Sequence, residues 1–166
     1  HRDEFPAGPM RTLQDAVGAL LGVDVHYYAT IDMAGFSRLV DAAGGVTVTV
    51  ATGFRDPDYR YAPGVRGWGI EPGVHRLDGR DALAFVRIRK APGESDFTRA
   101  ARQQQVLVGL FRGLLAEGSL LVRLPELLRS VGSMVETDLP PGLLPSLAAI
   151  ADGMSPGDIL RLVIKA

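Results

Sequence analysis

Apolar residues recur every three or four positions in several stretches of the chain, which is the spacing of one helix face. In the first stretch Leu13, Val17 and Leu20 share such a face, and Gly22 can close the helix. Segments that contain glycine or proline separate most of the later stretches. The pattern predicts helices over residues 9–22, 33–45, 77–87, 95–118, 124–135 and 140–153.

Other stretches alternate apolar and polar residues or are rich in β-branched and aromatic residues, which favours strands. They lie at residues 25–32, 46–50 and 159–166. Strands that alternate with helices predict an α/β fold, a mixed sheet with helices packed on both faces in three layers. The length of 166 residues suits one domain over the whole chain. Three strands are few for such a sheet.

Residues 51–76 show neither the three-to-four spacing of a helix nor the alternation of a strand. They are expected to form a long loop, and such segments are often functional or mobile. This segment contains Tyr59, Tyr61 and Trp68. These aromatic side chains are expected either to rim a sugar or lipid site or to pack against one another within the loop.

The net charge of −1 argues against duplex DNA as the main partner, because proteins that neutralise many phosphates are usually basic. The absence of cysteine excludes disulfides, thiolate zinc sites and cysteine nucleophiles. His1, His26 and His75 are too widely spaced for a metal-ligand motif. The most apolar stretch, residues 106–122, is interrupted by charged residues and is not expected to span a membrane.

Positive charge is concentrated between residues 87 and 102, where five basic residues face two acidic ones. The basic residues are Arg87, Arg89, Lys90, Arg99 and Arg102. Arg99 and Arg102 fall in the first turns of the helix over 95–118, where a cation faces the positive end of the helix dipole. Either Asp96 offsets this charge or an anion binds at the helix start, where free N–H groups and guanidinium groups suit a phosphate. A solvated basic surface is the simpler explanation of Arg87 and Arg89 taken alone.

An apolar stripe continues the same helix beyond these arginines. Its members are Val106, Leu107, Leu110 and Leu114. A cationic head followed by an apolar tail would fit a ligand with a diphosphate and an isoprenoid chain, since each buried CH₂ contributes about 0.8 kcal/mol. The stripe would equally form part of the core, and for the apolar residues alone the core is the favoured interpretation.

Four segments, in order along the chain, resemble segments of the LytR-CpsA-Psr family. The first two are IDMAGFSRLVDAAGGVTVTV and GVHRLDGRDALAFVRIRK, the second of which ends in an Arg-x-Arg pair. The third is DFTRAARQQQVL, with the pattern Asp-x-x-Arg-x-x-Arg-Gln, and the fourth is VETDLPPGLLPSLA. The resemblance therefore runs through most of the chain.

The resemblance implies a site for the diphosphate of a lipid-linked glycan. The residues that match this head-group site are Arg87, Arg89, Arg99 and Gln103. Asp96 and Arg102 match the same motif with supporting roles, Asp96 orienting an arginine and Arg102 lying behind the residues that touch the ligand.

The implied activity is that of a phosphotransferase-type ligase in cell-wall assembly. A glycan phosphate leaves a polyprenyl-diphosphate carrier and joins a peptidoglycan hydroxyl; the polymer of such a ligase is a teichoic acid, an arabinogalactan or a capsule. The resemblance also implies Mg²⁺, which bridges the diphosphate and neutralises developing charge. The complete protein is expected to be extracytoplasmic, held at the membrane by an anchor outside these residues, with no nucleic-acid partner.

One part of the family pattern has no counterpart in the chain. The family domain opens with strands that carry aspartates and an Ile-Pro-Arg-Asp-like motif, and no strand precedes Arg2 and Asp3 here. We therefore expect a sheet that is incomplete at its N-terminal side, with metal ligands and catalytic base outside this chain. On its own the chain is then expected to bind the carrier at most. The alternatives are a non-catalytic module for polyprenyl phosphate or another anionic lipid and, less favoured by the charge, a transcriptional regulator.

Overall fold

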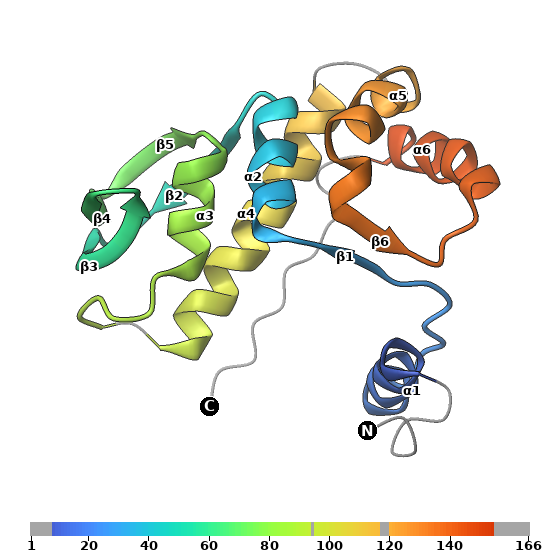
Figure 1. The fold of residues 1–166 in the computed structure, drawn as a ribbon, viewed down its shortest axis with the longest axis horizontal. Helices are drawn as coiled ribbons and strands as arrows, with labels where there is room; N and C mark the ends of the chain where they lie inside the picture. Colours follow the sequence, from blue (N-terminus) through green and yellow to red (C-terminus); the bar gives the residue numbers. More distant parts are fainter. Residues whose placement is uncertain (1–7, 94, 117–119, 155–166) are drawn as a thin grey trace.

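A computed structural model describes residues 8–93, 95–116 and 120–154, in which helices and strands alternate along most of the chain (Figure 1). The α-helices are α1 (Pro9–Leu21), α2 (Met33–Ala42), α3 (Gly79–Arg87), α4 (Asp96–Ala116), α5 (Leu120–Val131) and α6 (Leu144–Asp152). Two short 3₁₀ helices, η1 (Gly132–Met134) and η2 (Pro141–Leu143), lie before β6 and α6. The predicted α/β class is confirmed, and each predicted helix has a counterpart.

The strands form three antiparallel pairs among the described residues. They are β1 (Ala29–Ile31), β2 (Val46–Val50), β3 (Phe54–Ala62), β4 (Val65–Ile70), β5 (Gly73–Leu77) and β6 (Val135–Thr137). β1 pairs with β6, β2 with β5, and β3 with β4, so one continuous mixed sheet is not formed within the described part of the chain. The strand predicted over 159–166 lies outside the described residues.

The prediction of a long loop over residues 51–76 is wrong. β3 and β4 form a hairpin there, and β5 follows directly and pairs with β2. Pro57 and several glycines hide this structure in the sequence, because both residue types are depleted in strands. The β3–β4 pairing also shifts register twice, which breaks the alternation that a regular strand would show.

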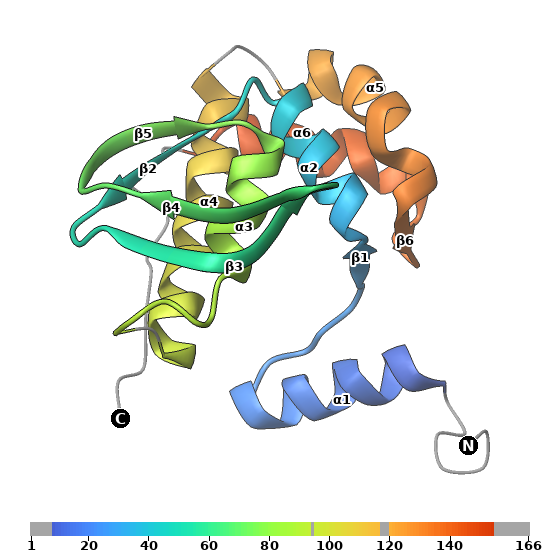
Figure 2. The same cartoon turned by 60° about the vertical axis from the view of Figure 1, so that its left-hand side comes forward.

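The core lies between β2, the hairpin and helices α2, α3 and α4 (Figure 2). The alternation in β2 is complete, since Val46, Val48 and Val50 are buried while the threonines between them are exposed. Gly109 lets α4 pass close to this strand, because a Cβ there would lie 2.7 Å from Cγ2 of Val46. Close packing of α4 on β2 fixes the helix that carries half of the candidate site.

Aspartates hold the starts of the two helices that surround this core. Asp32 caps α2 by accepting from the Gly35 N–H at 2.6 Å, and Asp78 caps α3 by accepting from the Asp81 N–H at 2.8 Å. Asp41 accepts from the Gly79 N–H at 2.7 Å and so joins α2 to the first turn of α3. These bonds position α3, whose far end carries the candidate arginines.

The hairpin is fastened to α3 by one carboxylate. The Tyr61 hydroxyl and Trp68 Nε1 donate to the same Asp81 oxygen, at 2.8 and 2.7 Å. Phe54 packs between Trp68 and Phe85, with ring centroids 6.0 and 5.9 Å away. Trp68 thus packs against Phe54 and Tyr61 is bonded to Asp81, and a role of these rings at a sugar or lipid site stays a prediction.

α1 lies apart from the other helices in both views, joined to β1 by an extended segment (Figures 1 and 2). The apolar stripe predicted for this helix is solvent-exposed, with Leu13 54% and Leu20 83% exposed. Within the described residues, no helix combines the length and the apolar character that crossing a membrane requires.

Candidate functional site

The segment that leaves α3 presents two arginines on either side of a buried residue. Arg87 ends the helix, Ile88 is extended and 1% exposed, and Arg89 is exposed again. Alternation along an extended backbone sends Ile88 into the core and both arginines toward the surface. The local structure thus agrees with the expectation that Arg87 and Arg89 emerge together.

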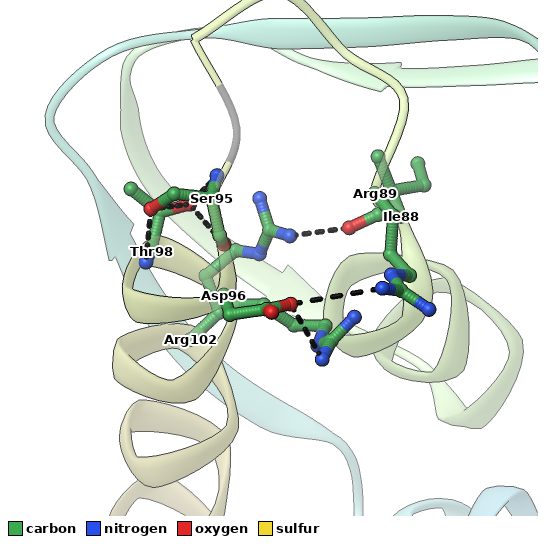
Figure 3. Close-up of polar contacts among 7 residues, drawn as sticks. Ile88, Arg89, Ser95, Asp96, Thr98 and Arg102 are labelled. Atoms are coloured by element: carbon green, nitrogen blue, oxygen red, sulfur yellow. Dashed lines mark hydrogen bonds and ion pairs between the residues drawn. The ribbon is translucent and has the colours of Figure 1, made fainter.

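Arg102 ties this segment to α4 from behind. Arg102 is 7% exposed, and its guanidinium donates from Nη2 to the Ile88 carbonyl at 2.6 Å (Figure 3). The same group lies 4.5 Å from the ring centroid of Phe54 and 5.6 Å from that of Phe85. A buried cation held by a carbonyl and two aromatic faces is a structural clamp. This environment is the one expected for a supporting residue.

A reciprocal pair of side-chain hydrogen bonds caps the start of α4. The Thr98 N–H donates to Ser95 Oγ at 3.1 Å, and the Ser95 N–H donates to Thr98 Oγ1 at 2.8 Å. This reciprocal pair fixes the first turn of α4 and hence the direction of Asp96 and Arg99.

Arg89 and Arg99 converge on a single carboxylate oxygen. Asp96 Oδ1 lies 2.8 Å from Arg99 Nη2 and 3.8 Å from Arg89 Nη2 (Figure 3). The Arg99 side chain is 24% exposed, whereas Arg89 and Asp96 are mostly exposed. Exposed ion pairs contribute roughly 1 kcal/mol or less, so fold stability alone does not account for this arrangement.

Arg87 and Gln103 lie outside this cluster. Arg87 contacts Tyr59 of β3: burial raises the pKa of the Tyr59 phenol, and the Arg87 guanidinium, close enough to share a hydrogen bond, opposes that rise. Gln103 is exposed on α4, one turn beyond Arg99. The structure therefore brings together Arg89, Arg99 and Asp96 of the predicted set.

Tyr59, one of the aromatic residues expected either to rim a sugar or lipid site or to pack within a loop, lies beside Arg87. Correct assignment of β3 would have placed it on a strand beside the end of α3. Residue preferences do not predict this strand, because Pro57 lies within it and proline is rare inside strands.

The apolar residues proposed for a lipid pocket do not share one face of α4. Val106 and Leu110 are buried in the core, and Leu114 packs against it. Leu107 is 62% exposed. Core packing, the interpretation favoured from the sequence, accounts for three of the four side chains, and the lipid-binding role stays a prediction.

The described residues do not fit a protein-held magnesium ion at this site. No group of three histidine or carboxylate side chains gathers anywhere in the described part of the chain. Asp96 is the carboxylate of the cluster and is already engaged by two guanidinium groups. Chemically, the cluster suits an anion: each guanidinium has five N–H donors in a planar fork that matches phosphate oxygens.

Three relatives illustrate what the chain is similar to. It is 33% identical over 132 residues to the polyisoprenyl-teichoic acid–peptidoglycan teichoic acid transferase TagU of Oceanobacillus iheyensis, covering 80% of this chain and 38% of that protein. The protein of the same name in Bacillus cereus is 36% identical over 123 residues, covering 74% of this chain and 37% of the relative. The crystal structure of B. subtilis TagV superposes with a TM-score of 0.72 at 26% identity, covering 93% of this chain and 57% of that chain.

The chain thus spans less than two fifths of the length of these curated relatives. The profile of the LytR_cpsA_psr family matches residues 4–164, which is nearly the whole chain. The ordered motifs, the α/β fold and this match together show that the chain belongs to the LytR-CpsA-Psr family.

Proposed function

We propose that this chain is the part of a glycopolymer–peptidoglycan transferase that holds the diphosphate of a polyprenyl-linked glycan. The observation that carries the proposal is the convergence of Arg89 and Arg99, from two separate segments, on one oxygen of Asp96. The teichoic acid transferase names of the relatives support the same reaction class. Asp96 holds the two guanidinium groups together, and their remaining N–H groups bind phosphate oxygens.

In the proposed reaction, a peptidoglycan hydroxyl attacks the phosphorus atom that carries the glycan. The bond from this phosphorus to the bridging oxygen of the diphosphate breaks, and polyprenyl phosphate leaves with that oxygen. The hydroxyl proton passes to a base, which we place outside this chain together with any ligands of Mg²⁺. Arg89 and Arg99 stabilise the negative charge that grows on the phosphate oxygens and the leaving group. Arg102 acts indirectly, because it fixes the backbone between Arg87 and Arg89.

The proposal includes a place in the cell. Both substrates, a lipid-linked glycan and peptidoglycan, belong to the extracytoplasmic side of the membrane. We therefore propose that the complete protein works there, held at the membrane by a segment outside these residues.

Binding of polyprenyl phosphate to the full-length protein tests the proposal directly. R89A and R99A should each weaken binding about ten-fold, because each removes charge-assisted hydrogen bonds to phosphate. The free energy of unfolding of each variant should lie within about 0.5 kcal/mol of that of the unchanged protein, because the ion pairs that are lost are exposed or partly exposed. R38A, at an exposed arginine on α2, is the matched control and should bind normally. Equal losses in all three variants would leave the cluster without a binding role.

A non-catalytic module for polyprenyl phosphate or another anionic lipid is the second candidate, since the arginine cluster would account for binding without a catalytic step. An assay for attachment of a glycopolymer to peptidoglycan by the full-length protein distinguishes the transferase from the binding module. A protein that binds the carrier but yields no attached polymer is a module; attachment that depends on Arg89 and Arg99 supports the transferase.

A further inference from the structure

The side chains of β3 that face α3 change from even-numbered to odd-numbered positions partway along the strand. Phe54 packs against the core, and Asp56, two residues further on, is 5% exposed. Regular alternation would turn Asp58 inward next and Tyr59 outward. Asp58 is instead exposed, and Tyr59 is half-buried on the side of α3.

A β-bulge produces this change. The register between β3 and β4 shifts between Asp56 and Arg60, so residues 57–59 of β3 lie opposite Gly67 alone. The Asp56 carboxylate accepts from the Asp58 N–H at 3.0 Å, which fixes the start of the bulge. Gly67 has a φ of 86°, a conformation that favours glycine. Bulges of this kind commonly re-aim a side chain beside a functional site.

The side chain that this bulge re-aims meets the end of α3. The Arg87 guanidinium lies close enough to the Tyr59 phenol oxygen to donate a hydrogen bond to it. Without the bulge, regular alternation would turn Tyr59 to the opposite face of the hairpin, away from Arg87. The contact between these two side chains therefore depends on the irregular part of β3.

A phenol holds a guanidinium in place without neutralising it. Arg89 and Arg99 share the negative charge of Asp96, whereas Arg87 forms no ion pair with a carboxylate of the described residues. The hydrogen bond with the neutral Tyr59 hydroxyl limits where the guanidinium can point and leaves its charge and its other N–H donors to an external anion.

The two carboxylates of the bulge do not take the place of this phenol. Asp56 faces the same side as Tyr59 and acts on it electrostatically, but its printed hydrogen bond is with the Asp58 N–H. Asp58 is exposed on the other face. Neither forms an ion pair with Arg87, so among the described residues Tyr59 is the side chain of the hairpin that holds this arginine.

We propose that Tyr59 is a positioning residue of the diphosphate site, which directs Arg87 toward the phosphate groups of the ligand without neutralising its charge. The proposal rests on the proposed function, because it assumes that Arg87 binds the diphosphate. Each arginine beside Ile88 then has its own guide, Asp96 for Arg89 and Tyr59 for Arg87.

Binding of polyprenyl phosphate to the full-length protein tests the proposal. Y59F keeps the ring and removes the hydroxyl, and it should weaken binding about five-fold, whereas R87A should weaken it about ten-fold. The double variant Y59F/R87A should bind as R87A does, because Tyr59 acts only through Arg87. Y61F is the matched control: it removes a phenol from the same face of β3, one that is bonded to Asp81, and should change affinity by less than about two-fold.

Unchanged affinity in Y59F would overturn the proposal. Losses that multiply in Y59F/R87A would also overturn it, since Tyr59 would then act independently of Arg87. Equal losses in Y59F and Y61F would show only a general loosening of the hairpin and would count against it in the same way.

A titration without ligand separates this inference from the proposed function. Burial raises the pKa of the Tyr59 phenol and the Arg87 guanidinium opposes that rise, so R87A should move the ionisation of one tyrosine to higher pH, measured by phenolate absorbance. The same substitution in a Y59F background should move none. Carrier binding by the unchanged protein, with no change of this titration in R87A, would overturn the inference alone. Failure of the unchanged protein to bind polyprenyl phosphate would refute the proposed function, whatever the titration shows.

Discussion

The guanidinium of Arg102 donates to the main-chain carbonyl of Ile88 at 2.6 Å, and this bond joins α4 to the segment that presents Arg87 and Arg89. The two arginines of the convergent cluster come from different segments, Arg89 from the loop after α3 and Arg99 from α4. A bond between these segments therefore restrains the separation of the two backbone segments from which the guanidinium groups extend. Arg102 is in this sense a positioning residue of the site, although its buried side chain is itself turned into the core.

Replacement of Arg102 by methionine should both destabilise the protein and weaken carrier binding. R102M keeps apolar contact with Phe54 and Phe85 but leaves the Ile88 carbonyl without this donor. Loss of a charge-assisted hydrogen bond at a buried site should cost about 2 kcal/mol, measured by urea unfolding. R38M, at an exposed position, should change the free energy of unfolding by less than about 0.5 kcal/mol. A stable R102M protein with unchanged affinity for polyprenyl phosphate would refute the positioning role.

Gly79 should not tolerate alanine. A Cβ at this position would lie 2.0 Å from the main-chain oxygen of Ser37, so α2 and α3 would have to separate. G79A should therefore lose about 3 kcal/mol of stability in urea unfolding. G132A is the control, because nothing lies within 4 Å of a Cβ there, and its effect should stay below about 0.5 kcal/mol. Comparable losses in both variants would argue against close α2–α3 packing as the cause.

The helices were readable from the sequence because their signals are local. Asp32, Asp78 and Ser95 cap α2, α3 and α4, and short polar residues of this kind are common at helix starts. α5 begins earlier than predicted, at Leu120, and contains Pro125. Proline is most common in the first turn of a helix, so its place inside α5 is not one that residue preferences indicate.

The strands were harder to read because their partners are distant or irregular. Ala29 pairs with Thr137, more than a hundred residues away, and no local pattern announces such a contact. The β3–β4 hairpin is local but contains Pro57 and Gly67, and the positive φ of 86° at Gly67 accompanies its register shifts. The sequence motif predicts that Arg89 and Arg99 converge. The contact of Arg87 with Tyr59 could not be predicted, because Tyr59 lies on β3, in the segment expected to be a loop.

Replacement of Asp81 should loosen the hairpin without disturbing the core. Asp81 accepts from both Tyr61 and Trp68, so D81L leaves two partly buried donors without their acceptor. The expected loss of about 2 kcal/mol should be accompanied by a change in tryptophan fluorescence, because Trp68 is the single tryptophan of the chain. D58L, at an exposed carboxylate on the same hairpin, should leave both properties nearly unchanged. An unaltered tryptophan signal in D81L would show that this carboxylate does not hold the hairpin.

The same contact predicts how stability depends on alkaline pH. Burial and the hydrogen bond to Asp81 raise the pKa of Tyr61 to about 12, above its ordinary value of 10.0. A pKa raised in the folded state means that the neutral phenol stabilises the fold at pH values below 10, and that this contribution is lost as the pH rises from about 10 to about 12. Y61F has no phenol to ionise, so its unfolding free energy should fall less steeply than that of the unchanged protein over this range. In a titration followed by phenolate absorbance, Y61F should have one tyrosine fewer that ionises near pH 12. If the two proteins lose stability identically with rising pH, Tyr61 ionises freely and its bond to Asp81 does not persist in solution.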